Sequence, residues 1–388
     1  MTADPTTVAS DAQRVAAAGL ARHARPEAEI AARVMRDGIE ETWRWYAGRC
    51  RAAGREVPDP RRDLDAAAAA GAHLLLPGEP GWPESLAVLA HAAASSASRL
   101  RAGRGHGVPF CLWVRGQAQL DTLVGRSAAV VGARAATDYG VWVASEIAVG
   151  LAERKATVIS GGAFGIDAAA HRGALATSGM TVAVLAGGVD VPYPRAHDRL
   201  LDAVAEGGAL VTEMPPGTRP RREGFLVRNR LIAALAGGVV LVEAGLRSGA
   251  RNTMAHAAAL GRPRMAVPGP VTSAMSAGCH RELRDDPQVR VVTSAAEVLE
   301  EVGRLGDDLA RRGGGALDPR DDLGDRARDL LERLPSRGSW SVDRIARELG
   351  LRPVEALGIA GALADHGLLV RAGDRFGLSA LGRQPSAR

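Results

Sequence analysis

The stretch VISGGAFGIDAAAHRGAL, residues 158–175, contains the transition that decides the fold. A short β-branched run ends at Gly161 and Gly162, a third glycine follows at Gly165, and an alanine-rich segment comes next. This succession is typical of a strand, a tight turn and a helix. Backbone without side chains at the start of a helix lets another molecule approach, and helix N-termini favour anions. The candidates are a dinucleotide, a sugar phosphate and a nucleic-acid backbone.

The same alternation continues on both sides of this stretch. From about residue 127, segments of helical periodicity separate the apolar runs AAVVGA, ATVISG, TVAVLAG, ALVTEM, GVVLVEA, RMAVPG and VRVVTS. Continuous apolar strands between amphipathic helices predict a parallel sheet that is covered on both faces. We therefore expect an α/β fold with a Rossmann-like, doubly wound, mostly parallel sheet.

The flanking regions have different patterns. Residues 1–75 are alanine-rich and predict a helical N-terminal domain, and residues 76–303 carry the Rossmann-like pattern. Residues 304–323 are rich in Gly, Asp and Arg and predict a charged linker. Residues 324–388 predict three short helices followed by a strand–turn–strand, which is the pattern of a winged-helix domain.

Composition limits the class of protein. A chain of 388 residues with 46% hydrophobic residues favours two or three folded domains. It contains no apolar run long enough to span a bilayer and no secretory signal pattern at its start, so we expect a cytoplasmic protein without a membrane partner. Cys50, Cys111 and Cys279 lie far apart, which predicts reduced, partly buried thiols and neither a disulfide framework nor a zinc site.

The excess of basic over acidic residues is weak evidence for a nucleic-acid partner. The net charge is +5, yet among the Lys and Arg residues only Lys155 is a lysine. Together with the many alanines and glycines, this points to a GC-rich coding bias. The placement of charge must therefore decide whether nucleic acid is a partner.

Glycine-rich loops follow nearly every predicted strand. They are GARAATDYG, SGGAFGID, AGGVDVPYP, EMPPGTRPRREGF and EAGLRSGARNT. Loops after parallel strands gather at one sheet edge, where ligands bind, so these predict a polyanion-binding rim. GGAFG lacks the G-x-G-x-x-G order of dinucleotide sites and no G-K-[ST] follows any turn, so we expect no nucleotide cofactor.

The densest positive charge follows one of these loops. RNR falls at the start of a predicted helix, so Arg228 and Arg230 are expected to flank one groove while Asn229 offers its amide to a base or sugar. The alternative is a solvated helix face. The full cluster is Arg219, Arg221, Arg222, Arg228 and Arg230, opposed locally by Glu223.

Three other residues raise catalytic or metal chemistry. Asp167 and His171 stand four apart on a helix, as two metal ligands do, but no third ligand is evident. A capping Asp and a hydrogen-bonded structural His explain them as well. Glu243 is either a general base or the acceptor that holds the LRSG turn. We assign no catalytic residue and no metal.

Taken together, these segments resemble the family of the DNA-processing protein DprA, also called Smf, over residues 77–303. The segments are AAVVGARAATDYG, SGGAFGIDAAAHRGAL, TVAVLAGGVDVPYP, LVTEMPPG, FLVRNRLIAALAGGVVLVEAGLRSGARNT and AVPGP. The resemblance implies a homodimer that binds and protects single-stranded DNA, loads the RecA recombinase in natural transformation, and is not an enzyme. It also implies an N-terminal domain of the SAM or helix-hairpin-helix type.

The resemblance also implies a DNA groove. The chain departs from the family at Phe164, where Arg is frequent, and at Val227, where a basic residue is frequent; Phe164 can instead stack on a base. The groove residues carried over are Gly132 and Arg134, then Ser160, Gly161, Gly162 and Gly165, then Arg228, Asn229 and Arg230, and finally Ser248, Gly249 and Thr253.

Two other functions remain alternatives. A nucleotide phosphoribohydrolase-like Rossmann enzyme would carry PGGxGTxxE, whereas this chain has AGGVD. A winged-helix transcription regulator would read duplex DNA, but its expected recognition helix, PVEALGIAGALADHG, has few Arg, Asn or Gln side chains. The winged helix therefore fits a protein–protein or dimer module better.

Overall fold

The computed structural model describes residues 8–24, 28–90, 107–116, 119–303, 308 and 323–383. Its contacts divide the chain into two compact units, residues 1–310 and 311–388, which we describe separately. Most of the predicted linker, residues 304–323, lies outside the described residues.

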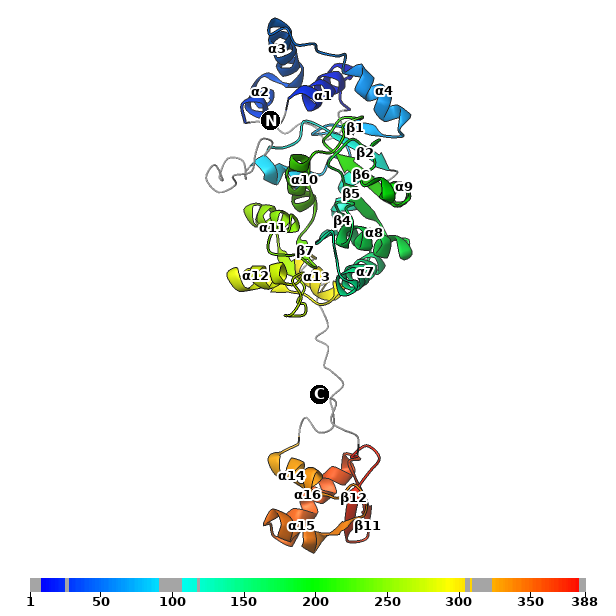
Figure 1. The fold of residues 1–388 in the computed structure, drawn as a ribbon, viewed down its shortest axis with the longest axis vertical. Coiled ribbons are helices and arrows are strands. Elements are labelled where there is room, and N and C mark those ends of the chain that lie inside the picture. Colours follow the sequence, from blue (N-terminus) through cyan, green and yellow to red (C-terminus); the bar gives the residue numbers. More distant parts are fainter. Residues whose placement is uncertain are drawn as a thin grey trace. The chain divides into compact units, whose positions relative to one another are not determined.

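The first unit is built on a nine-stranded sheet (Figure 1). Every apolar run predicted from residue 127 onward forms a strand, and these strands are parallel to one another. The expected α/β fold with a mostly parallel sheet is confirmed. The spatial order is β1 (His73–Leu75), β2 (Leu112–Gly116), β6 (Gly208–Thr212), β5 (Thr181–Val184), β4 (Thr157–Ser160), β3 (Ser127–Val131), β7 (Val239–Leu241), β8 (Arg264–Ala266) and β9 (Val289–Val291).

Two antiparallel strands extend this sheet at the β6 edge. β2 pairs antiparallel with β6, and β1 pairs antiparallel with β2. The apolar run LLL, residues 74–76, predicts a strand and overlaps β1, but no prediction covers β2. Leu112, Trp113 and Val114 of β2 are buried, so this strand contributes to the core.

Helices cover both faces, because side chains alternate along each strand. Ala129 and Val131 of β3 belong to the apolar cluster under one layer, whereas Ala128 and Val130 belong to the cluster under the other. Figure 1 shows these two layers on opposite sides of the sheet. One layer is α10 (Arg222–Leu235), α11 (Ala250–Ala259) and α12 (Ala277–Asp285); the other is α7 (Asp138–Glu153), α8 (Ile166–Ala176), α9 (Asp198–Glu206) and α13 (Ala295–Val302).

The N-terminal region is helical, as expected, and packs on the antiparallel end of the sheet. Ala17 and Ala18 of α1 share a buried cluster with Leu74 of β1 and Trp113 of β2. The predicted boundary after residue 75 lies at the end of β1, inside the first unit. The helices are α1 (Asp11–His23), α2 (Ala28–Asp37), α3 (Ile39–Ala52) and α4 (Arg61–Ala69).

The second unit contains the three helices and the terminal hairpin that the sequence predicts, together with a two-residue strand. Its core encloses Leu330, Ile345, Leu363 and Phe376. The three strands form an antiparallel sheet in the order β10-β12-β11. The elements are α14 (Asp325–Arg333), β10 (Trp340–Ser341), α15 (Val342–Leu349), α16 (Pro353–Asp365), β11 (Leu369–Ala372) and β12 (Arg375–Leu378).

All three cysteines are free thiols, and they are buried where the sequence predicts partial burial. Among the described residues, no helix is both long and apolar enough to cross a membrane.

Candidate nucleic-acid cleft

The sheet has a topological switch point between β3 and β7. From β3 the chain adds β4, β5 and β6 on one side, and then returns to add β7, β8 and β9 on the other. The loops after β3 and β7 therefore leave in opposite directions and open a crevice, which is where ligands bind in open α/β sheets. A cleft of about 1010 Å³ lies here. Among the residues that line it are seven predicted ones: Gly132, Arg134, Arg228, Asn229, Ser248, Gly249 and Thr253.

Exposed arginines surround this cleft, which we call the switch-point cleft. Arg134 comes from the loop after β3, Arg222 from the first turn of α10 and Arg247 from the loop after β7. The guanidinium of Arg134 lies 4.7 Å from the centre of the Phe225 ring. Within the described part of the chain none of the three forms an ion pair with a carboxylate, so their charge is available to an anion.

Arg228 lies deeper in the cleft. It is 5% exposed, and its Nη1 donates a hydrogen bond of 2.8 Å to the carbonyl oxygen of Val184. Burial lowers the pKa of Arg228 to about 10, which leaves the side chain charged at neutral pH, and the nearby Asp167 opposes this shift. Burial likewise raises the pKa of Asp167, against the attraction of Arg228. Arg228 therefore contributes a fixed positive charge beneath the cleft.

Arg230 lies elsewhere, although the sequence places it beside Arg228. It is 1% exposed and its Nη2 is 2.5 Å from Oε2 of Glu213, at the end of β6. Each residue of a helix is rotated by about 100° from the one before, so residues two apart point to nearly opposite sides and cannot both face one groove. The expectation that Arg228 and Arg230 flank one groove is wrong, and the alternative of a solvated face is wrong for these two residues, whereas Arg219, Arg221 and Arg222 are exposed.

The side chains of Asn229 and Ser248 in the cleft form hydrogen bonds with other parts of the protein. The Nδ2 atom of Asn229 donates to the carbonyl oxygen of Gly249 and to Oδ1 of Asn252, both at 3.3 Å. The Oγ atom of Ser248 accepts from the backbone N–H of Ala250. These bonds fix the start of α11 against α10, so in this structure the Asn229 amide positions backbone.

In the turn after β4, Ala163 lines the cleft, but the predicted Ser160 and the three glycines do not. The buried Oγ of Ser160 donates to the carbonyl oxygen of Val130 at 2.6 Å. A Cβ on Gly161 would lie 1.8 Å from Nη1 of Arg228. Gly165 has φ of +74°, and a Cβ there would lie 2.2 Å from the carbonyl oxygen of Ala133. The missing side chains thus make room for protein atoms.

Two other predicted glycines show the same use. A Cβ on Gly132 would lie 2.5 Å from Cγ1 of Ile166, at the start of α8. Gly162 is buried, has φ of +72° and would place a Cβ 3.2 Å from Leu201. Gly132 therefore lets α8 approach β3, and Gly162 provides a turn that other residues do not favour.

Phe164 is 48% exposed, as the sequence predicts for an aromatic in this turn. Its ring meets that of His197 edge-on, with centroids 4.6 Å apart. Phe164 is outside the lining of the switch-point cleft. Its stacking on a base stays a prediction.

The catalytic and metal candidates have structural partners. The buried His171 forms a 2.7 Å hydrogen bond through Nδ1 with Thr181, and burial lowers its pKa to about 3. Glu243 accepts from the backbone N–H and the hydroxyl of Thr137, at 2.9 and 2.6 Å. It does not hold the LRSG turn, contrary to one of the two expectations. The described residues contain no group of acidic, His or Cys side chains able to hold a metal ion.

Arg247 and Tyr193 are among the members of the cleft that sequence reasoning missed. Arg247 lies in the loop EAGLRSGARNT, which the sequence places on the ligand side, so its position was available as a signal. Tyr193 comes from the loop after β5 and lies 5.5 Å from Phe225 between ring centroids. Only the packing of α10 against that loop brings the two rings together.

Comparison with known proteins agrees with this architecture. The family model described as DNA recombination-mediator protein A matches residues 75–303. A Mycobacterium tuberculosis protein named DprA is 49% identical over 88% of this chain and 84% of its own length. The DNA processing protein DprA of Streptococcus pneumoniae is 39% identical over 50% of this chain and 67% of its own.

A solved structure is similar over much of the chain. The X-ray structure of DprA from Streptococcus pneumoniae aligns with a TM-score of 0.55 and 28% identity, covering 69% of this chain and 82% of that one. The family match spans the whole parallel sheet and the loops that form the switch-point cleft. The chain therefore belongs to the DNA recombination-mediator protein A family, the DprA or Smf proteins, which are DNA-binding recombination mediators and not enzymes.

Proposed function

We propose that this chain binds single-stranded DNA in the switch-point cleft. The observation that carries the proposal is a group of three exposed arginines, Arg134, Arg222 and Arg247, which form no ion pair with any described residue and lie near the buried charge of Arg228. A phosphate backbone is the polyanion that such a cleft accommodates, and the aromatic rings of Tyr193 and Phe225 offer stacking surfaces for bases.

The same geometry supports low sequence selectivity. Arginines and backbone contact phosphates, which are the same at every nucleotide, whereas the amide of Asn229 is already bonded to protein atoms. We therefore assign Gly132, Arg134, Arg228, Ser248 and Gly249 to the strand-binding surface, together with Arg222 and Arg247. Phe164 is a separate stacking contact. The other predicted residues support this surface: Ser160, Gly161, Gly162, Gly165, Asn229, Arg230 and Thr253.

A gel shift tests this function. Single-stranded and duplex DNA of equal length are titrated across a salt series with the full chain, and the single strand is expected to bind more tightly. Arg134→Ala, Arg222→Ala and Arg247→Ala should each weaken binding and reduce the salt dependence. Arg172→Ala is the matched control, because Arg172 is exposed on α8, outside the cleft. Equal affinity for duplex and single strand would contradict the proposal.

We propose further that the bound strand is protected and passed to the RecA recombinase during natural transformation, as family membership suggests. The expected result is that the chain speeds RecA assembly on single strands that another binding protein already covers. Arg222→Ala should lose this effect in proportion to its loss of DNA affinity. An unchanged rate of RecA assembly would remove this part of the proposal.

We also propose that the chain forms a homodimer in the cytoplasm and that the second unit is a winged helix. The three helices and the antiparallel sheet of the second unit support the winged-helix assignment. α16 exposes Val354 and Leu357, apolar side chains suited to a protein contact more than to a base edge. Light scattering should give a mass near twice 40.3 kDa. A monomer at micromolar concentration would contradict the dimer.

A further inference from the structure

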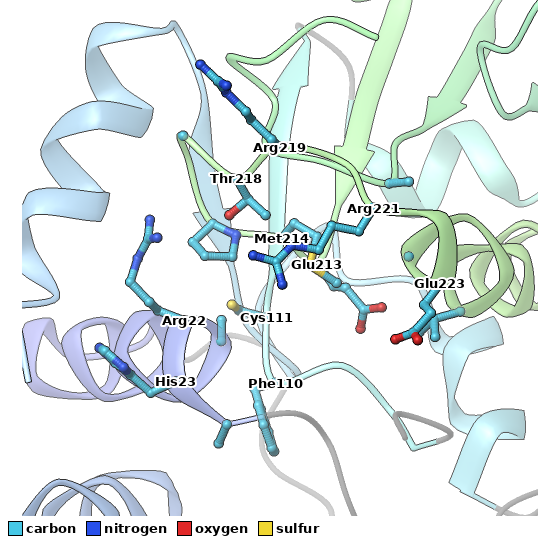
Figure 2. A pocket seen from close by; sticks show the side chains of 17 residues that line it. Arg22, His23, Phe110, Cys111, Glu213, Met214, Thr218, Arg219, Arg221 and Glu223 are labelled. Atoms are coloured by element: carbon cyan, nitrogen blue, oxygen red, sulfur yellow. The ribbon is translucent and has the colours of Figure 1, made fainter. Parts of the chain in front are cut away.

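A second pocket lies on the other side of α10, and the cleft function does not use it. It has a volume of about 580 Å³ and lies between the end of α1, the start of β2 and the loop after β6 (Figure 2). We call it the edge pocket. Its volume falls within the range of small-molecule sites. Its lining includes Phe110, Glu213, Met214, Arg219, Arg221 and Glu223.

The edge pocket contains a buried carboxylate with unused hydrogen-bonding capacity. Glu213 is 8% exposed, and its Oε2 pairs with Arg230. Its other oxygen, Oε1, is buried and has no hydrogen-bond partner among the described residues. An unsatisfied charged acceptor is unfavourable, so a ligand that supplies an N–H or O–H donor here gains binding energy.

The mouth of the pocket has the opposite character. Arg219 and Arg221 are exposed and form no ion pair in the described part of the chain, whereas Glu223 is the one exposed carboxylate among the lining residues. In Figure 2 the carboxylates of Glu213 and Glu223 lie on one side, and the guanidinium of Arg219 points away from them. Between these ends, Phe110 and Met214 supply apolar surface.

This arrangement selects a ligand class. The ligand needs a donor at its inner end, a flat apolar body and an anionic group at the mouth. A nucleotide has all three: an exocyclic amine, a base and a phosphate. A carboxylate accepts well from the N4 amine of cytosine, whereas uracil and thymine present a carbonyl oxygen at that position. A cationic peptide is disfavoured, because the positive charges of Arg219 and Arg221 at the mouth of the pocket repel it.

We propose that the edge pocket binds one nucleotide whose base carries an exocyclic amine, with Glu213 Oε1 accepting from that amine and Arg221 holding the phosphate. The nucleotide is either free or part of a DNA strand, and both share this chemistry. The pocket is separate from the switch-point cleft, since α10 divides them: Arg221 and Glu223 face one, and Arg222 and Phe225 face the other.

Calorimetric titration of the full chain with dCMP and dUMP tests the proposal. These probes differ at the amine and in the N3 proton, so the loss of one charge-assisted hydrogen bond should make dUMP bind about tenfold more weakly. Equal affinities for dCMP and dUMP, or no binding of either in the millimolar range, would overturn the proposal.

Two neighbouring arginines provide the matched variants. Arg221→Ala should weaken dCMP and dUMP binding alike, by about threefold to tenfold, and preserve their ratio. Arg222→Ala should change neither, although it weakens DNA binding in the cleft. Equal loss in both variants would contradict the edge pocket as the site. Failure of the cleft proposal alone would leave the dCMP preference intact, so the two proposals are separable.

Glu213→Gln removes the charge but keeps an oxygen for Arg230, and it should bring the dCMP to dUMP ratio close to one. If Glu213→Gln fails to fold, the ratio of dCMP to dUMP affinity in the natural chain and the comparison of Arg221→Ala with Arg222→Ala still test the proposal. Short homopolymers of deoxycytidine and deoxyuridine identify the source. If the homopolymers show a preference for cytosine and Arg221→Ala reduces that preference, the pocket binds a base within a strand. If only the mononucleotides show the preference, the pocket binds a free nucleotide. Either outcome supports the pocket chemistry.

Discussion

Replacing Arg230 by alanine should destabilise the fold without changing how DNA is bound. Arg230 is 1% exposed and pairs with Glu213, which is 8% exposed. Removing one partner of a buried ion pair leaves an uncompensated charge and costs about 3–5 kcal/mol. Because Glu213 also lines the edge pocket, we expect water to reach its carboxylate once the Arg230 side chain is removed, and therefore a cost of about 3 kcal/mol, the lower end of that range. Total stability is only about 5–15 kcal/mol, so this loss is easy to detect.

Urea denaturation followed by circular dichroism measures the effect. The matched control is Arg222→Ala on the same helix. Arg222 is exposed and forms no ion pair with the residues that the structure describes, so its loss should change the free energy of unfolding by less than about 0.5 kcal/mol. For DNA binding we expect the larger effect from Arg222→Ala and the smaller one from Arg230→Ala. Arg222→Ala should lower the slope of log affinity against log salt by about 0.7, the value for one phosphate on single strands. Arg230→Ala should leave that slope unchanged.

A third variant checks the cause of the destabilisation. Replacing Glu213 by leucine together with Arg230 by methionine removes both charges and fills similar volume, so most of the lost stability should return. An Arg230→Ala variant as stable as Arg222→Ala would contradict a structural role for the buried ion pair. A flatter salt dependence in Arg230→Ala would contradict it too, because Arg230 would then be contacting phosphate.

Other predictions concern the turn after β4 and the helix that follows it. Phe164→Ala should weaken DNA binding by about 1–3 kcal/mol with little change in salt slope; a lowered melting temperature with normal binding would instead make Phe164 structural. His171 titrates near 6.5 when unfolded but near 3 when folded, so the unfolded chain binds more protons and stability falls as pH drops from about 6.5 towards 3. His171→Gln should flatten that decline by about 1.4 kcal/mol per pH unit, measured by urea denaturation; parallel curves would contradict this. Gly165→Ala should cost about 2 kcal/mol or more, because its φ is +74° and a Cβ would meet Ala133 backbone, whereas Gly249→Ala, with open space around it, should cost less than about 0.5 kcal/mol; equal unfolding midpoints would be the contrary result.

The sequence alone determined the sheet and its ligand edge. Continuous apolar runs and helical segments follow each other in strict alternation, and parallel strands joined by helices must bring all their following loops to one edge. Period-two alternation then sends Ala129 and Val131 to one helical layer and Ala128 and Val130 to the other. These properties are local and repeat along the chain, so they could be predicted without coordinates.

Tertiary packing decided what individual side chains in that edge do. RNR is a basic motif in the sequence, yet the phase of α10 against β5 and β6 puts Arg228 beneath the cleft and Arg230 against Glu213. Position 161 requires glycine because the Arg228 guanidinium occupies the space that a side chain would need. β2 is part of the sheet because it pairs with β6, almost a hundred residues later in the chain. Each outcome depends on contacts between distant segments, and only the folded chain brings those segments within bonding distance.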